Sequence, residues 1–112
     1  MVKVAFAAED DKGVESNISA HFGRCPYYVY VEVERGKIKS LEVKKNPFLN
    51  VHEPGALPRL MADEGVDVIV AGGMGPRAAN LFRTFGIKTI IGVRGTVESA
   101  LRTLMERGDL KI

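Results

Sequence analysis

Residues 67–78 read Asp-Val-Ile-Val-Ala-Gly-Gly-Met-Gly-Pro-Arg-Ala, and this stretch decides the fold. Its first part is a continuous apolar run, which is typical of a strand in the middle of a parallel sheet that is covered on both faces. Glycines follow at once, and Pro76 then stands at a plausible first helical position, ahead of apolar residues with helical spacing that stop at Gly86. The stretch therefore predicts a strand that turns directly into a helix.

The sequence on either side repeats this unit. Residues 56–64 have helical spacing and stop at Gly65, and residues 87–93 form another short apolar strand. Thr96 is a good N-cap for a last helix, which stops at Gly108. From residue 56 onward we therefore predict the order helix, strand, helix, strand, helix.

The first half of the chain is predicted to be mostly extended. Residues 2–8 form a short apolar strand. Residues 27–34 are rich in aromatic and β-branched residues, and residues 37–44 alternate strictly between apolar and polar. With the turn at residues 35–36, the pair indicates a β-hairpin with one face or edge in contact with water. Residues 9–25 have no helical period, so we expect a loop that is long enough to carry function.

Together these elements predict an α/β fold. Two βαβ crossovers and one hairpin give a five-stranded mixed sheet in the order 3-2-1-4-5, with only the second strand antiparallel and with helices on both faces. Ligands of such sheets bind beyond the carboxyl ends of the strands where the winding reverses, here between the first and fourth strands. We therefore expect loops 9–25 and 46–55 and the glycines of 72–75 to surround one crevice.

The composition excludes several classes of protein. The 112 residues, 46% apolar and 27% charged, fit one globular domain spanning residues 1–112. The net charge is only +2 and both signs are spread along the chain, so the sequence has no basic stretch of the kind that binds nucleic acid. No apolar run approaches the ~18 residues of a membrane span and no signal peptide is recognisable, so we expect a cytoplasmic protein without a membrane partner. A single cysteine excludes a disulfide framework, and the absence of Gln favours a thermophilic source over chance sampling.

Three segments carry a resemblance to a known family. Residues 16–25 (Ser-Asn-Ile-Ser-Ala-His-Phe-Gly-Arg-Cys) fit the signature S-x-H-F-G-x-[CA], and residues 65–78 and 86–97 fit further along the chain. In these motifs the chain resembles the dinitrogenase iron-molybdenum cofactor biosynthesis family, which includes NifX-type carriers and the C-terminal domain of NifB. The resemblance implies a ribonuclease-H-like α/β fold. It also implies a carrier or storage role for an iron-sulfur or iron-molybdenum cluster.

Soft donors in the first motif are candidate cluster ligands. His21 and Cys25 are spaced i, i+4, and imidazole and thiolate are ligands that iron-sulfur clusters accept. His52 is a weaker candidate metal ligand in a second loop. Each has an alternative interpretation: a backbone-capping loop histidine for His21, a small buried hydrophobe for Cys25, and a solvated loop histidine for His52. The resemblance adds weight to His21 and extends the cofactor contact over the motif residues His21, Phe22, Gly23 and Arg24.

The glycine-rich turn is a candidate anion site. Exposed N–H groups and the dipole at the start of the predicted helix favour an anion, and Arg77 adds a positive charge in the first turn. The alternative is that the glycines only let the chain turn tightly from sheet to helix. The expected contacts are Gly72, Gly73, Met74, Gly75 and Arg77. The same residues match G-x-G-x-x-A of dinucleotide folds, but no acidic residue ends the following strand to hold a ribose.

These observations favour a non-catalytic protein that binds an anionic metallocluster as cargo. An interaction module that works with a cluster-assembly protein or an ATPase is the second hypothesis. A metal- or nucleotide-dependent enzyme is the third. The acids at positions 9–11 follow the first strand, but the fourth strand ends in glycines and offers no converging carboxylate for two-metal hydrolysis.

Overall fold

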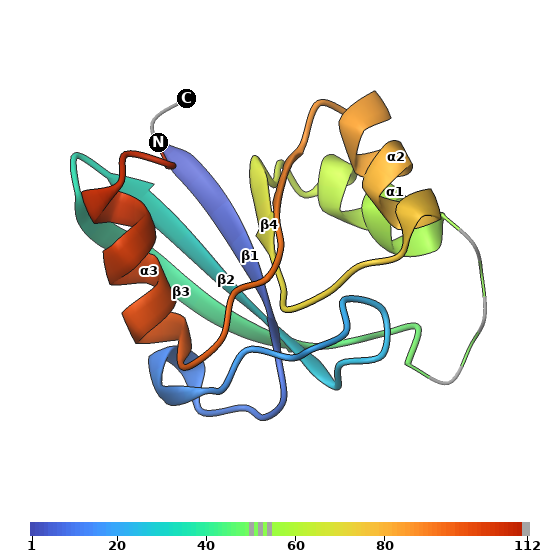
Figure 1. Cartoon of the computed structure of the whole chain (residues 1–112), viewed down its shortest axis with the longest axis horizontal. Coiled ribbons are helices and arrows are strands. Elements are labelled where there is room, and N and C mark those ends of the chain that lie inside the picture. Colours follow the sequence, from blue (N-terminus) through green and yellow to red (C-terminus); the bar gives the residue numbers. More distant parts are fainter. Residues whose placement is uncertain (50, 52, 54, 111–112) are drawn as a thin grey trace.

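The computed structural model describes residues 1–49, 51, 53 and 55–110 and has a five-stranded sheet in the order β3-β2-β1-β4-β5 (Figure 1). β1 pairs with β2, and β2 with β3, in antiparallel fashion, whereas β1 with β4 and β4 with β5 are parallel. Only β2 therefore runs against the others, which confirms the predicted topology. The strands are β1 Val2–Ala8, β2 Tyr27–Glu34, β3 Lys37–Lys45, β4 Val68–Val70 and β5 Lys88–Ile90.

Helices cover both faces of this sheet, as predicted. Figure 1 shows α3 on one side of the strands and the pair α1 and α2 on the other. The helices are α1 Ala56–Asp63, α2 Pro76–Thr84 and α3 Val97–Glu106, and a 3₁₀ turn, η1, spans Gly13–Glu15. Among the described residues, no helix has the length and apolar character that a bilayer crossing requires.

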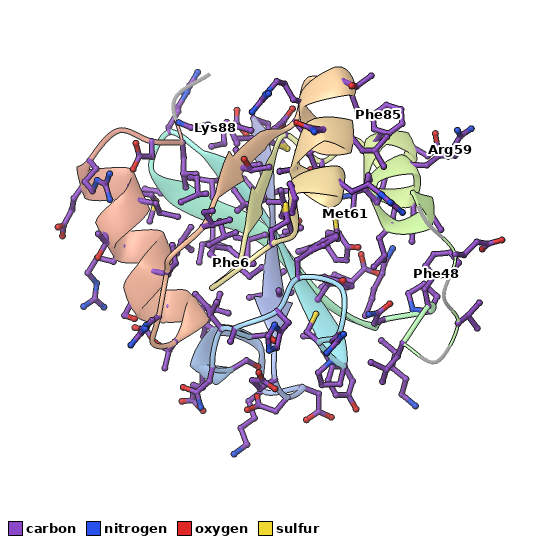
Figure 2. The ribbon with its side chains drawn as sticks, turned by 45° about the vertical axis from the view of Figure 1, so that its right-hand side comes forward. Phe6, Phe48, Arg59, Met61, Phe85 and Lys88 are labelled. Atoms are coloured by element: carbon purple, nitrogen blue, oxygen red, sulfur yellow. The ribbon has the colours of Figure 1, made fainter. Side chains whose placement is uncertain are left out.

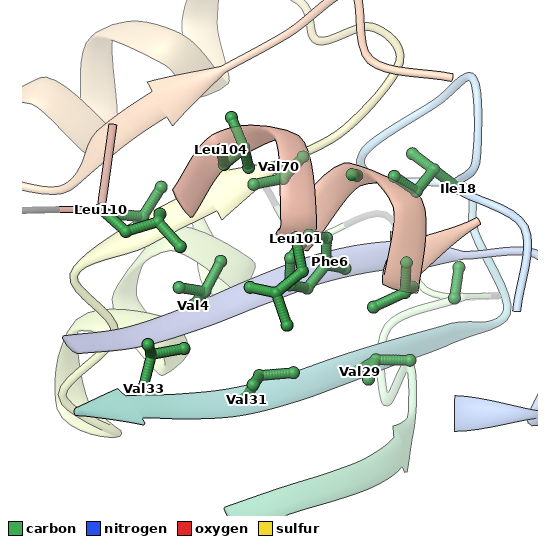
Figure 3. Packing of buried hydrophobic residues seen from close by; sticks show 14 residues of the cluster. Val4, Phe6, Ile18, Val29, Val31, Val33, Val70, Leu101, Leu104 and Leu110 are labelled. Atoms are coloured by element: carbon green, nitrogen blue, oxygen red, sulfur yellow. The ribbon is translucent and has the colours of Figure 1, made fainter. Parts of the chain in front are cut away.

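The side chains of β1 divide between two cores because neighbouring residues of a strand point to opposite faces. Val4 and Phe6 pack under α3, while Ala5 and Ala7 pack under α1 and α2. Figure 3 shows the α3 side, where valines of β2 and β4 surround Leu101 and Leu104. Burying one such side chain is worth roughly 1.5–3 kcal/mol, so both faces contribute to holding the strands in register.

The helix ends follow the sequence signals. Gly65 and Gly86 adopt positive φ angles of +79° and +76° directly after α1 and α2, a conformation that glycine enters without steric cost. The N–H of Val66 donates to the carbonyl of Met61, five residues earlier, which is the 6→1 hydrogen bond of a Schellman motif. At the start of α3, Thr96 Oγ1 accepts from the N–H of Ser99 at 3.1 Å, which confirms the predicted N-cap.

Two strands are shorter than predicted. The apolar runs predicted over 67–71 and 87–93 form strands only over Val68–Val70 and Lys88–Ile90. Beyond them the backbone makes irregular contacts: the N–H of Gly72 donates to the carbonyl of Ser19, and the N–H of Gly92 donates to that of Gly72. The strand ladder ends after β4 because Gly72 there pairs with Ser19, which belongs to the loop that follows β1.

That loop, predicted over residues 9–25, is more ordered than its sequence suggests. The N–H of Ile18 donates to Gly95 and that of Ser19 to Ala7, both at 2.8 Å, and Ser16 is fully buried. Asn17 also forms an isolated bridge with Thr96. These bonds fasten the segment across the carboxyl ends of β1 and β4, so the residues after it start from a fixed position.

The closest approach in this region is between two stretches of backbone, around Ala20 and at Gly72–Gly73. The N–H of Gly72 donates to Ser19 O at 2.8 Å, and the N–H of Phe22 donates to Gly73 O at 3.0 Å. A Cβ on Gly72 would lie 2.8 Å from Ala20 Cα, and one on Gly73 would lie 2.8 Å from Ala20 O. Only glycine fits at these two positions, because the atoms it faces belong to backbone that cannot move aside.

We therefore predict that Gly72→Ala lowers the free energy of unfolding by about 1–3 kcal/mol, the usual cost of forcing an extra carbon into a packed site. Gly75→Ala is the matched control, since nothing lies within 4 Å of its added Cβ and its φ of −69° suits alanine. Guanidinium unfolding followed by circular dichroism measures both. Equal midpoints for the two variants would contradict the close approach.

Candidate functional site

A crevice of about 670 Å³ opens beside the carboxyl end of β4, on the α1 and α2 side of the sheet. Three parts of the chain form its walls: the loop of residues 20–24, the described residues between Phe48 and Pro58, and the turn from Gly73 into α2. Figure 2 shows Phe48 on the same side of the molecule as α1 and α2. The three loops that were expected to meet at the switch point thus contribute to this region, although only part of loop 9–25 lines the crevice.

Most of the predicted site residues line this crevice. They are His21, Phe22, Gly23, Arg24, Gly73, Met74, Gly75 and Arg77. Gly72 lies behind the wall, where it makes the close approach to Ala20. The structure does not place Cys25 on the crevice, and His52 lies outside the described residues. The sequence motifs thus locate two of the three walls.

His21 is exposed, but its backbone is firmly held. Its N–H donates to Ser19 Oγ at 3.1 Å, and the same hydroxyl donates to its carbonyl at 3.0 Å. Ser19 is only 2% exposed, so water competes little for these bonds. Together with the bond from Phe22 to Gly73, they fix the backbone of His21 at the edge of the crevice.

Phe22 anchors the same loop in the core. Its ring lies 5.0 Å from that of Phe82 in an edge-to-face arrangement and 5.8 Å from that of Tyr28. Its carbonyl accepts from Tyr28 Oη at 2.6 Å. Burial raises the pKa of Tyr28 well above its usual value, so this phenol remains a donor at every physiological pH. The aromatic contacts bury Phe22 in the core, while the neighbouring His21 stays exposed.

Cys25 lies beneath the loop. The residue is 1% exposed, and Sγ is 3.3 Å from the carbonyl oxygens of both Phe22 and Tyr27. Burial raises the pKa of the thiol to about 11, so the thiolate that would bind a metal is scarce at neutral pH. This arrangement fits the interpretation of Cys25 as a small buried hydrophobe. Within the described part of the chain, no three His, Cys, Asp or Glu side chains gather as a metal site.

The crevice is bordered mainly by positive charge. Arg24 and Arg77 are exposed on two of its walls together with His21, and Glu53 is the carboxylate among the described lining residues. No side chain caps the N-terminus of α2, where Gly75 is the N-cap and Pro76 the first helical residue. Charge and helix dipole both favour an anion here. The remaining lining side chains are apolar: Ala20, Phe22, Phe48, Val51, Leu57, Pro58, Met74, Ala78 and Leu81.

Sequence reasoning missed two buried polar residues that shape the site. Ser19 lies within the motif of residues 16–25 without an assigned role, and Asn46 opens the expected loop 46–55. Asn46 is 6% exposed and donates through Nδ2 to the carbonyls of Gly23 and Cys25. The one available signal was its position, a polar residue between the predicted hairpin strand and Pro47.

Two known proteins are similar to this chain over most of its length. The uncharacterized protein MJ0580 of Methanocaldococcus jannaschii is 29% identical over 108 residues, 95% of this chain and 87% of that protein. The crystal structure of PH0822 superposes with a TM-score of 0.84 at 38% identity, over 99% of this chain and 96% of that one.

The fold also matches more distant structures. The apo form of the orange protein from Desulfovibrio gigas superposes with a TM-score of 0.82 at 23% identity, over 96% of this chain and 89% of that one. The family model described as "Dinitrogenase iron-molybdenum cofactor" matches residues 1–107, nearly the whole chain. The resemblance seen in the sequence motifs is confirmed: this chain belongs to the dinitrogenase iron-molybdenum cofactor family.

Proposed function

We propose that this protein is a non-catalytic carrier that binds an anionic iron-sulfur or iron-molybdenum cluster in the crevice. The main support for this proposal is the composition of the crevice walls. Among the described lining residues, the charged or ionisable side chains are one exposed imidazole, two guanidinium groups and the single carboxylate of Glu53, and all the others are glycine or apolar. Membership of a family described by the iron-molybdenum cofactor supports the same cargo.

The walls suit a sulfide-rich cluster better than an organic metabolite. A cluster presents polarisable, negatively charged sulfides that accept hydrogen bonds but donate none, which matches guanidinium donors and apolar contacts. A nucleotide or a sugar requires carboxylate or amide acceptors for its hydroxyl groups. Among the described lining residues, Glu53 alone carries a carboxylate, and none carries a side-chain amide.

His21 supplies the directional bond in this proposal. A neutral imidazole nitrogen coordinates iron, and the fixed backbone of His21 sets its approach. One protein ligand leaves the other coordination positions of the cluster to exchangeable groups, which allows release to a recipient. Arg24, Arg77 and the start of α2 add charge attraction without a covalent bond. Cys25 is not part of this donor set, and His52 stays a prediction from the sequence.

The proposal includes a protein that delivers or receives the cluster, either a cluster-assembly protein or an ATPase. A carrier requires such a protein because its cargo must be loaded and later handed on. The exposed position of His21 and of both arginines leaves the cargo accessible to it.

We predict that His21→Ala binds a preformed [4Fe–4S] cluster with exchangeable thiolate ligands about 30- to 1000-fold more weakly than wild type, because a lost metal contact costs ~2–4 kcal/mol. Anaerobic titration followed by the visible absorption of the cluster gives stoichiometry and affinity. The iron-molybdenum cofactor is tested in the same way. Asn17→Ala is the control, an exposed position on the same segment whose bridge to Thr96 uses only backbone atoms.

This prediction has a clear contradictory result. Equal binding of both clusters by wild type and His21→Ala would refute the ligand role of His21, and failure of wild type to bind either cluster would refute the carrier proposal. Asn17→Ala should match wild type, which shows that a change in the segment alone does not disturb uptake.

We further predict that Arg77→Ala weakens binding of the same cluster by about fivefold at low salt, the effect of one partly screened charge worth ~1 kcal/mol. Added salt should erase this difference, because exposed charges are screened within about 10 Å at 0.1 M ionic strength. Titrations at low and high sodium chloride measure it. Arg83→Ala, in the last turn of the same helix and outside the crevice lining, should behave as wild type. A salt-independent loss for Arg77→Ala would mean that its charge is not the cause.

A further inference from the structure

Asn46 joins two walls of the crevice without lining it. It follows the last residue of β3 directly, at the base of the segment that carries Phe48. Its Nδ2 donates to Cys25 O at 2.9 Å and to Gly23 O at 3.2 Å, while its Oδ1 accepts from the N–H of Phe48 at 2.9 Å. Gly23 and Phe48 both line the crevice, on different walls. A single planar amide therefore spans the distance between them.

The surroundings of Asn46 specify an amide. Its donor end faces two carbonyl oxygens and its acceptor end faces an N–H, so each end meets the partner that it requires. The backbone N–H of Asn46 also donates to Pro26 O at 2.9 Å. Because the residue is 6% exposed, little water is available to replace a lost bond.

We propose that Asn46 is a positioning residue: its carboxamide holds the wall of residues 20–24 and the wall that carries Phe48 at the separation that the cargo requires. The inference rests on the proposed carrier function and deepens it. It explains how a site with one directional ligand keeps a defined shape, because the walls are held by buried bonds and not by the cargo. Outer residues that orient metal ligands commonly contribute 10–100-fold in affinity.

Asn46→Asp tests this geometry because aspartate has the same shape. As a carboxylate it repels the carbonyl oxygens of Gly23 and Cys25, whereas the protonated acid can donate to one of them and still accept from Phe48. Burial beside these carbonyls favours the neutral acid, so protonation at lower pH should restore the bridge. Nearby, the Cys25 thiol stays neutral because burial raises its pKa to about 11, and Arg24 and Lys45 flank the segments as cations.

The experiment measures uptake of the thiolate-ligated [4Fe–4S] cluster by wild type, Asn46→Asp and Asn46→Ser at pH 6 and pH 8.5, each variant being compared with wild type at the same pH. This ratio cancels every effect of pH that the variants share with wild type. We expect Asn46→Asp to bind about tenfold more weakly at pH 8.5 and to approach wild type at pH 6. Asn46→Ser is too short to span both walls and cannot titrate, so its loss should be the same at both pH values.

The outcomes separate the two proposals. Failure of wild type to bind the cluster would overturn the carrier function, and the positioning role with it. If wild type binds the cluster and both Asn46 variants bind it with the same affinity as wild type, the positioning role alone is overturned. A defect in Asn46→Asp that is the same at both pH values would also overturn it. If Asn46→Asp does not fold at pH 8.5, Asn46→Ser decides: a loss of about tenfold supports the role and wild-type affinity refutes it.

Discussion

The architecture of the site depends on one close contact between two stretches of backbone. Ser19–Ala20 and Gly72–Gly73 approach so nearly that no Cβ fits on either glycine, and paired hydrogen bonds hold them together. This contact ties the segment after β1 to the turn after β4, the two strands between which the winding reverses. Without it, His21 and the start of α2 would be on independent loops. With it, they share one rigid base, and the crevice between them has a fixed floor.

The polar groups around that base are buried and paired, while the groups that meet the cargo are exposed. Ser19, Asn46 and the Tyr28 hydroxyl each bind a carbonyl or an N–H of the wall segments. Among the described residues, no buried side-chain nitrogen or oxygen lacks a hydrogen bond. Such paired networks rigidify a structure. The conformational entropy of the walls is therefore lost when the protein folds and not when it binds the cargo. A rigid cradle with one coordinating side chain suits cargo that must later leave.

Much of the fold follows from local signals in the sequence. The uninterrupted apolar run at Val68–Val70 indicated a central parallel strand, and the glycines at 65 and 86 marked helix ends, because these features depend on neighbouring residues alone. The site was only partly predictable. The motif located His21 and the turn at Gly73, but nothing local links Asn46 to Cys25, 21 residues earlier, or Ser19 to Gly72. For the same reason, residues 9–25 seemed a free loop: their order comes from bonds to β1 and to Gly95.

The most direct test is a ¹⁵N-resolved NMR comparison of the protein before and after anaerobic loading with one equivalent of the [4Fe–4S] cluster. The paramagnetism of the iron broadens only nearby amides, so the spectrum locates the cargo without any substitution. We expect broadening at residues 20–24 and 73–78 and unchanged signals from α3, which lies on the opposite face of the sheet. Broadening centred on α3 or on the outer edge of β3, with the crevice amides unaffected, would contradict the crevice as the cargo site.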